Sequence, residues 1–128
     1  VLITVPHDED LRANEARYTE YMMDGAEIVV VAYGTAGRIV QPAVKQARAQ
    51  GIPVGLFRPI SVFPYPYEAL NKVADNTRQF LVVELNTGQM LEEVRLATRD
   101  RVPISFFGKT GGLVPLPEEI LAEIKKLA

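Results

Sequence analysis

The sequence contains no cysteine and no tryptophan, and its 128 residues include only 1 histidine. Without cysteine, the chain has no residues for disulfide bonds, thiolate metal sites, iron–sulfur ligation or cysteine nucleophiles. The single histidine, His7, leaves too few parts for a transition-metal site or a serine–histidine nucleophile. We therefore expect this chain to hold no metal and to carry no catalytic residue of its own.

A charge excess of one sign and a long apolar run are also lacking. The 14 Lys and Arg residues nearly balance the 16 Asp and Glu residues, which argues against a nucleic-acid-binding domain or a polybasic membrane-surface domain. The longest apolar run, Ile28–Tyr33, is far shorter than the roughly 20 residues of a membrane-spanning helix. No secretory signal is visible, so we expect a cytoplasmic protein without nucleic-acid or membrane partners.

Four apolar segments predict strands that are buried on both faces. They are residues 28–33, 53–58, 80–85 and 103–107. Continuous apolar runs of this length, rich in β-branched residues, are typical of parallel sheets that are covered on both sides. The sequence therefore predicts helices between these strands.

The intervening segments do carry apolar residues at helical spacing. They predict helices over residues 38–50, 67–76, 87–99 and 117–127. Proline is tolerated in a first turn, so Pro42 predicts either a regular helix that starts near Gln41 or an irregular entry. The alternation of strands and helices predicts an α/β domain with three layers (α/β/α) and a mainly parallel sheet of four to five strands.

The N-terminal part differs in composition from the rest. We interpret residues 1–24 as a lead-in segment and residues 25–128 as the α/β domain. The charged stretch Asp8–Met23 predicts a helix, and Leu2–Val5 is compatible with a short edge strand of either direction. The length predicts one domain. Because the first residue is not Met, we expect the chain to be part of a longer protein.

Two glycine-containing segments follow predicted strands. Gly34–Arg38 opens a helix, where backbone N–H groups can hold an anion, but its glycines are spaced G-x-x-G and not G-x-G-x-x-G. A tight turn is the favoured interpretation, and a phosphate or interface contact is the alternative. Gly108–Gly112 contains Gly-Lys-Thr, but Pro103 stands where a P-loop needs glycine. We therefore predict a flexible loop there.

Two further features lie where predicted strands end. Arg58–Pro66 contains three prolines and is expected to form a stiff aromatic loop, which either presents a functional surface or plugs the core. Arg58 needs a carboxylate or phosphate, because burying an unpaired guanidinium is costly. Glu84 is expected to be partly buried and to pair with Arg58 or an outside cation. A structural role is favoured over acid–base catalysis, since no His or Lys stands beside it.

Three motifs, taken together, resemble the alpha subunit of 2-oxoacid:ferredoxin oxidoreductases. They are the run Val31–Arg38, the run Arg58–Pro66 with its Phe-Pro-Tyr-Pro ending, and the run Val83–Gln89. The likeness is to the C-terminal domain of that subunit, which has a transketolase C-terminal-like fold, and it covers about residues 11–127. Family members often have Trp-Pro-Phe-Pro where this chain has Val-Phe-Pro-Tyr-Pro.

The resemblance implies a role in a larger complex. Such complexes oxidatively decarboxylate a 2-oxoacid to an acyl-CoA and reduce ferredoxin, using thiamine diphosphate, magnesium and an iron–sulfur cluster. This domain is expected to bind none of these cofactors and to contact the other domains of the alpha subunit and a thiamine-binding beta subunit. The positions that match the family, and that we expect at the interface, are Gly34, Arg38, Arg58, Phe63, Pro64, Glu84, Asn86 and Gln89.

Two alternatives remain open on the sequence alone. The first is an autonomous nucleotide- or anion-binding α/β module that uses Gly34–Arg38 and Gly108–Gly112 as anion loops. The second is the C-terminal domain of a transketolase or E1-type thiamine enzyme, which shares the predicted fold.

Overall fold

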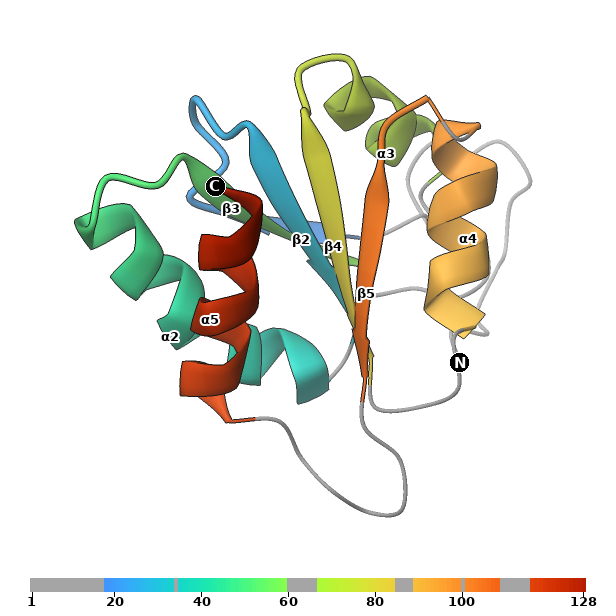
Figure 1. Ribbon diagram of the computed structural model, residues 1–128. Helices are drawn as coiled ribbons and strands as arrows, with labels where there is room; N and C mark the ends of the chain where they lie inside the picture. The colour runs from blue at the N-terminus through green and yellow to red at the C-terminus, as the bar shows by residue number, and fades with distance from the viewer. Residues whose placement is uncertain (1–17, 34, 60–66, 85–88, 100, 109–115) are drawn as a thin grey trace.

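The computed structural model describes residues 18–33, 35–59, 67–84, 89–99, 101–108 and 116–128. These residues form one five-stranded sheet in the order β1-β3-β2-β4-β5, with helices on both of its faces (Figure 1). The predicted three-layer α/β arrangement with a mainly parallel sheet is therefore confirmed.

The strands are β1 (Tyr18–Tyr21), β2 (Ile28–Ala32), β3 (Val54–Pro59), β4 (Gln79–Glu84) and β5 (Ile104–Gly108). Strands β2 to β5 run parallel, whereas β1 pairs with β3 in the antiparallel direction. Strand β2 lies at the centre of the sheet, and each of its residues is buried. Its unbroken Val/Ile composition is what a strand covered on both faces requires.

The helices are α2 (Thr35–Ala49), α3 (Tyr67–Ala74), α4 (Gln89–Thr98) and α5 (Pro117–Leu127). Helix α2 packs beside α5 on one face of the sheet, and α3 packs beside α4 on the other (Figure 1). Side chains alternate between the two faces along β2: Val30 joins the core under α2 and α5, whereas Val29 and Val31 join the core under α3 and α4. The sheet therefore separates two hydrophobic cores.

The helix predicted over Asp8–Met23 is wrong at its C-terminal end. Tyr18–Tyr21 is the edge strand β1, and residues 8–17, like Leu2–Val5, lie outside the described part of the chain. Tyr and Thr favour strands when a half-buried sheet edge is available to them. The aromatic ring of Tyr18 stacks on that of Phe57 in β3, with ring centroids 4.9 Å apart. This contact with the edge of β3 favours the strand conformation of Tyr18–Tyr21.

Helix α2 contains Pro42 well inside it, because the helix begins at Thr35, several residues earlier than predicted. A proline in a helix removes one backbone hydrogen bond to the carbonyl four residues earlier, here that of Arg38. Both Arg38 and Pro42 lie on the exposed face of α2. Water can therefore satisfy the freed carbonyl, and the helix accommodates the proline.

The turn between β1 and β2 is held by Arg48 of α2. Its Nε donates a hydrogen bond of 2.7 Å to the carbonyl of Val54, and its Nη2 donates bonds of 2.6 Å to the carbonyls of Met22 and Asp24. Gly55 lets this turn approach β3, since an ideal Cβ there would lie 2.6 Å from Met23 Sδ. The turn is thus fixed against both α2 and β3.

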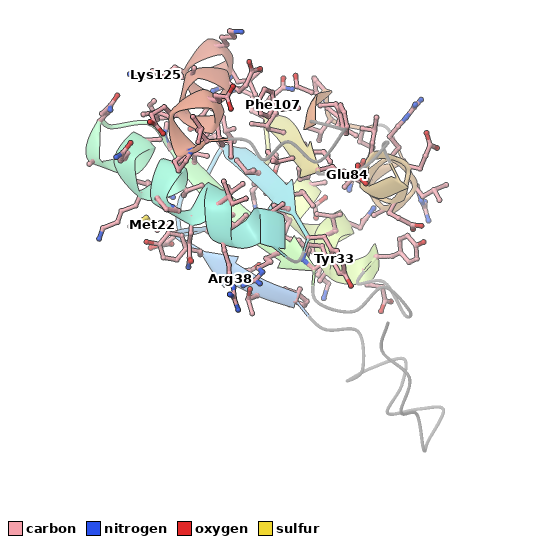
Figure 2. All side chains as sticks on the ribbon, turned by 90° about the horizontal axis from the view of Figure 1, so that it is seen from below. Met22, Tyr33, Arg38, Glu84, Phe107 and Lys125 are labelled. Carbon is pink, nitrogen blue, oxygen red and sulfur yellow. The ribbon has the colours of Figure 1, made fainter. Side chains whose placement is uncertain are left out.

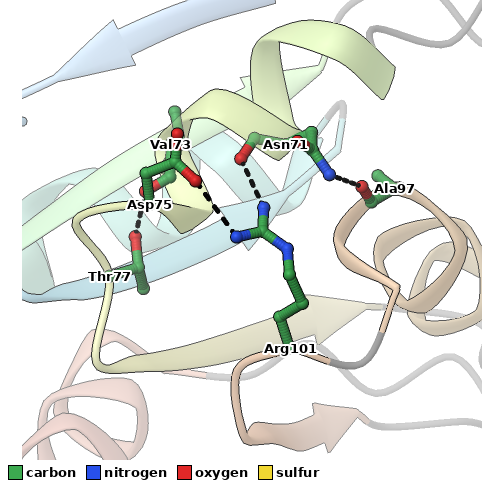
Figure 3. Close-up of polar contacts among 6 residues, drawn as sticks. All are labelled: Asn71, Val73, Asp75, Thr77, Ala97 and Arg101. Carbon is green, nitrogen blue, oxygen red and sulfur yellow. Dashed lines mark hydrogen bonds and ion pairs between the residues drawn. The ribbon is translucent and has the colours of Figure 1, made fainter.

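On the opposite face, polar contacts join α3 to the end of α4 (Figure 3). Asn71 Nδ2 donates a hydrogen bond of 2.7 Å to the carbonyl of Ala97. Arg101 donates to the Asn71 carbonyl at 2.9 Å and to Asp75 Oδ1 at 3.0 Å. These contacts set the position of the two helices without involving the end of the sheet where β2 to β5 terminate.

Candidate functional site

The four parallel strands β2 to β5 end at one edge of the sheet, called the carboxyl edge here. In α/β proteins this edge is where ligands and partners are bound. Figure 2 looks onto it from below and labels Tyr33, Arg38 and Glu84, which come from the end of β2, the first turn of α2 and the end of β4. Three of the residues expected at an interface, Arg38, Arg58 and Glu84, have described side chains at this edge.

Arg58 and Glu84 lie on opposite faces of the sheet. Phe57 packs into the core under α3 and α4, so its neighbour Arg58 faces α2. Val83 packs into the core under α2 and α5, so Glu84 faces α4. Strand β2 also lies between β3 and β4. The expected pairing of Glu84 with Arg58 is therefore wrong, because strand alternation turns the two side chains apart.

The side chain of Arg58 runs across the first turn of α2 at Gly37. An ideal Cβ on Gly37 would lie 2.6 Å from both Cδ and Nε of Arg58, and 2.9 Å from its Cγ. Gly37 has no Cβ, and the arginine stem occupies that space. The second glycine of the G-x-x-G motif is thus needed for close packing between α2 and Arg58.

The guanidinium of Arg58 lacks an acceptor among the described residues. Its Nε is buried and makes no hydrogen bond, although the residue as a whole is only partly buried. A buried N–H without a partner costs about 1–3 kcal/mol. Arg58 therefore carries a positive charge, fixed at the carboxyl edge, that the described part of the chain does not neutralise.

The first turn of α2 adds to this positive charge. It contains no acidic residue, although acidic side chains are the ones that stabilise a helix N-terminus. It contains instead Arg38, which is exposed and is labelled in Figure 2. The Arg38–Arg58 region, meaning these two side chains with the first turn of α2, is a cationic surface.

Glu84 lies on the other face and is only 7% exposed. The end of β5 covers this strand end closely: an ideal Cβ on Gly108 would lie 2.7 Å from the Phe106 ring and 3.0 Å from the carbonyl oxygen of Glu84. The backbone of Glu84 therefore lies closely against the end of β5, and its side chain is buried. The structural role expected for Glu84 stays a prediction.

Of the remaining residues expected at an interface, the structure places the backbone of Gln89 alone. Gly34, Phe63, Pro64 and Asn86 lie outside the described residues, as do most of Arg58–Pro66 and Gly108–Gly112. Gln89 is the first residue of α4. The proposed roles of these residues stay predictions.

The described residues include few groups that could catalyse a reaction or bind a metal ion. They include no group of three or more His, Cys, Asp or Glu residues that could hold a metal ion. Among the helices of this described part, none is long and apolar enough to cross a membrane. The cationic surface at the carboxyl edge can bind an anion, but no described base, nucleophile or metal ligand set accompanies it.

One tyrosine of the described residues has a raised pKa. The Tyr67 hydroxyl at the start of α3 donates a hydrogen bond to Glu93 Oε1 on α4. This bond, followed by burial and the charge of Glu93, raises the pKa of Tyr67 from 10.0 to about 12. The Tyr67–Glu93 hydrogen bond joins α3 to α4.

Reasoning from the sequence missed the contact between Gly37 and Arg58. A signal for it was present. Gly37 follows β2 and Arg58 ends β3, and the two strands are adjacent and parallel in the sheet. Their motifs were therefore certain to meet at one edge once the strand order was known.

Taken together, the fold and the site define an α/β domain whose carboxyl edge is suited to binding. Residues 26–120 match the family described as pyruvate:ferredoxin oxidoreductase core domain II. The chain belongs to this family, and the resemblance noted from its motifs is confirmed.

Curated relatives agree with this family. The chain is 42% identical, over 92% of its length, to ketoisovalerate oxidoreductase subunit VorB of Methanothermobacter thermautotrophicus, and covers 33% of that protein. It is 37% identical, over 79% of its length, to 2-oxoglutarate synthase subunit KorA of Methanothermobacter marburgensis, and covers 27% of it. The chain thus spans a third or less of the length of these relatives.

Solved structures agree on the fold. The 2-oxoglutarate:ferredoxin oxidoreductase from Magnetococcus marinus superposes with a TM-score of 0.82 at 21% identity, over 92% of this chain and 21% of that one. A split-gene transketolase, described as an inactive beta4 tetramer, superposes with a TM-score of 0.73 at 19% identity, over 97% of this chain and 45% of that one. The predicted transketolase C-terminal-like fold is confirmed.

Proposed function

We propose that this chain is the interface domain of a thiamine-diphosphate-dependent 2-oxoacid:ferredoxin oxidoreductase. Its carboxyl edge contacts the other domains of the alpha subunit and a thiamine-binding beta subunit. The parent complex oxidatively decarboxylates a 2-oxoacid to an acyl-CoA and reduces ferredoxin. This domain supports the complex by holding its parts together.

The donor residues of this chain do not fit the cofactors of that reaction. The sequence has no cysteine to ligate an iron–sulfur cluster. The described residues offer no carboxylate cluster for magnesium beside a diphosphate. No reaction step is therefore assigned to this chain, and the cofactors belong to other parts of the parent complex.

The observation that carries the proposal is the cationic surface at the carboxyl edge of a domain from this family. Arg38 is exposed there, and the Nε of Arg58 has no acceptor among the described residues. Because the chain spans only 33% of its VorB relative, a parent protein of similar length has ample further surface to meet this edge.

The alternative of an autonomous nucleotide-binding module is less well supported. In phosphate-binding turns a glycine lets the backbone approach the phosphate. Here the space beside Gly37 is filled by the Cγ, Cδ and Nε of Arg58. A phosphate therefore meets an arginine stem at this position and not an open backbone.

The proposal is tested by a charge reversal at the carboxyl edge. Arg38→Glu in the full-length subunit should raise the Kd for assembly with the beta subunit. The melting temperature of the subunit should not fall, since Arg38 is exposed and an acidic side chain is favourable at a helix N-terminus. Lys45→Glu is the matched control, because Lys45 is exposed on the same helix but two turns away from the edge. Equal assembly by both variants and the wild type would contradict the proposal.

A further inference from the structure

We propose that Arg58 binds a side-chain carboxylate, from Asp or Glu, of the beta subunit, which covers the carboxyl edge in the parent complex. This inference rests on the proposed function and names the chemistry of the contact. Arg58 is then the residue of the cationic surface that anchors the partner, and the partner supplies an acidic residue.

The first support is the way in which Arg58 is held. The aliphatic stem lies in the space beside Gly37, with Cγ, Cδ and Nε within 3 Å of the position that a Cβ would take. An arginine on a protein surface ordinarily loses much rotamer freedom when it forms an ion pair. Packing against α2 has already restricted the Arg58 stem, so less freedom is lost when its guanidinium meets a partner.

The second support is the unsatisfied charge. The Nε of Arg58 is buried without an acceptor among the described residues, so water does not reach it. The guanidinium charge is delocalised over its three nitrogens, and an anion at the Nη end stabilises the whole group. A carboxylate that bridges the two Nη groups fits this end in a bidentate geometry.

The third support distinguishes a carboxylate from a phosphate. Phosphate sites at helix N-termini use several backbone N–H groups that point at the ligand. At Gly37 the arginine stem fills the approach to the backbone. The planar fork of the guanidinium is left as the recognition element, and it can bind a carboxylate or a phosphate in a bidentate geometry. A phosphate would gain no backbone N–H contact at Gly37, so a carboxylate on a protein surface is the favoured partner.

The experiment uses the full-length subunit and its beta subunit. Arg58→Gln removes the charge and should raise the Kd for assembly by at least about tenfold, as for loss of one member of a buried ion pair. The wild-type Kd should rise with salt more steeply than that of Arg58→Gln. The melting temperature of the free subunit serves as the folding control, and Lys45→Gln is the matched surface control.

A second variant separates binding from folding. If Arg58→Gln lowers the melting temperature of the free subunit, Arg58→Lys keeps the stem and the charge but loses the planar fork. Weaker assembly of Arg58→Lys at an unchanged melting temperature supports the proposal. Wild-type assembly of Arg58→Lys overturns the bidentate contact.

A charge swap identifies the partner residue. Arg58→Glu should abolish assembly, and changing one Asp or Glu of the beta subunit to Arg should restore it. If no such acidic residue restores assembly, the proposal is overturned. It is also overturned if inorganic phosphate raises the melting temperature of the wild-type subunit but not that of Arg58→Gln, since the ligand is then a small anion.

These results also separate the inference from the proposed function. If Arg38→Glu weakens assembly and Arg58→Gln does not, the edge is an interface but Arg58 is not its anchor. If neither variant weakens assembly, the proposed function itself is contradicted.

Discussion

Arg58 of β3 occupies the space that a side chain on Gly37 of α2 would need, since a Cβ there would lie 2.6 Å from its Cδ and Nε. This contact joins the two motifs that follow β2 and end β3. It also explains a glycine inside the first turn of a helix, where glycine is otherwise unfavourable. The positions of the helix and of the arginine are therefore coupled.

This coupling predicts that the effect of Gly37→Ala on the free energy of unfolding changes sign when the Arg58 side chain is removed. Gly37→Ala should destabilise the chain by about 0.5–1.5 kcal/mol, because the new methyl group displaces the flexible Arg58 side chain from its packing position. In an Arg58→Ala background the same change should be neutral or stabilising by up to about 1 kcal/mol, since alanine is the better helix former. Chemical denaturation of the four proteins of this double-mutant cycle measures the coupling.

The control for this cycle is a glycine at which an added Cβ would contact no other atom. Gly51 has nothing within 4 Å of an ideal Cβ but has a φ of +87°, so Gly51→Ala is strained whatever residue stands at position 58. The loss of stability caused by Gly51→Ala should be equal in the wild-type and Arg58→Ala backgrounds. If the loss of stability caused by Gly37→Ala were also the same in both backgrounds, the contact between Gly37 and Arg58 would be contradicted.

The stack between Tyr18 and Phe57 predicts the contribution of the edge strand. Tyr18→Ala should lower the free energy of unfolding by about 0.5–1.5 kcal/mol beyond the loss of buried area, because the paired rings are removed. Tyr18→Phe keeps the ring and should be nearly neutral. Urea denaturation measures both, and an equal loss in the two variants would argue against the stack.

The α3–α4 contacts predict a further stability effect. Asn71→Ala removes the hydrogen bond of 2.7 Å to the Ala97 carbonyl and should cost about 0.5–1.5 kcal/mol. Asn76, an exposed asparagine just after the same helix, is the matched control, and Asn76→Ala should be close to neutral. Thermal unfolding of both variants checks the difference, and equal melting temperatures would contradict the role given to Asn71.

The Tyr67–Glu93 hydrogen bond predicts a dependence on alkaline pH. The pKa of Tyr67 is raised from 10.0 to about 12, chiefly because its hydroxyl donates to Glu93. A raised pKa in the folded state means that the stabilisation is complete below pH 10.0 and is lost as pH rises towards 12. The stability difference between the wild type and Tyr67→Phe should therefore shrink over that range.

The measurement is the free energy of unfolding of both proteins at a series of alkaline pH values, together with tyrosinate absorbance. Tyr67→Phe should lack the tyrosinate transition near pH 12 that the wild type shows. A stability difference that stays constant through this range would contradict the hydrogen bond.

Most of the fold could be predicted from the sequence because its strands are continuous apolar runs. Residues 28–33 are such a run, and only a strand covered on both faces buries each of residues 28–32. Tyr18–Tyr21 could not be predicted, because a short polar segment becomes a strand only when the exposed edge of β3 is there to pair with it. Local propensity carries no information about that edge.

The site was predicted in part. The sequence indicated that Arg58 needs an anion and that the ends of the parallel strands would gather at one edge. It could not show that Arg58 and Glu84 face apart, because this depends on the register in which β3, β2 and β4 pair. Nor could it show that the stem of Arg58 fills the space at Gly37, which is a tertiary contact.

The proposal that this domain assembles the complex without taking part in the chemistry is tested most directly by turnover at increasing protein concentration. The rate of 2-oxoacid-dependent ferredoxin reduction is measured for the wild-type complex and for Arg38→Glu, with the assembled fraction determined in the same samples. A docking role predicts that the variant needs a higher concentration but reaches the wild-type rate per assembled complex. A lower rate per assembled complex at full assembly would contradict it, because Arg38 would then act on the reaction itself.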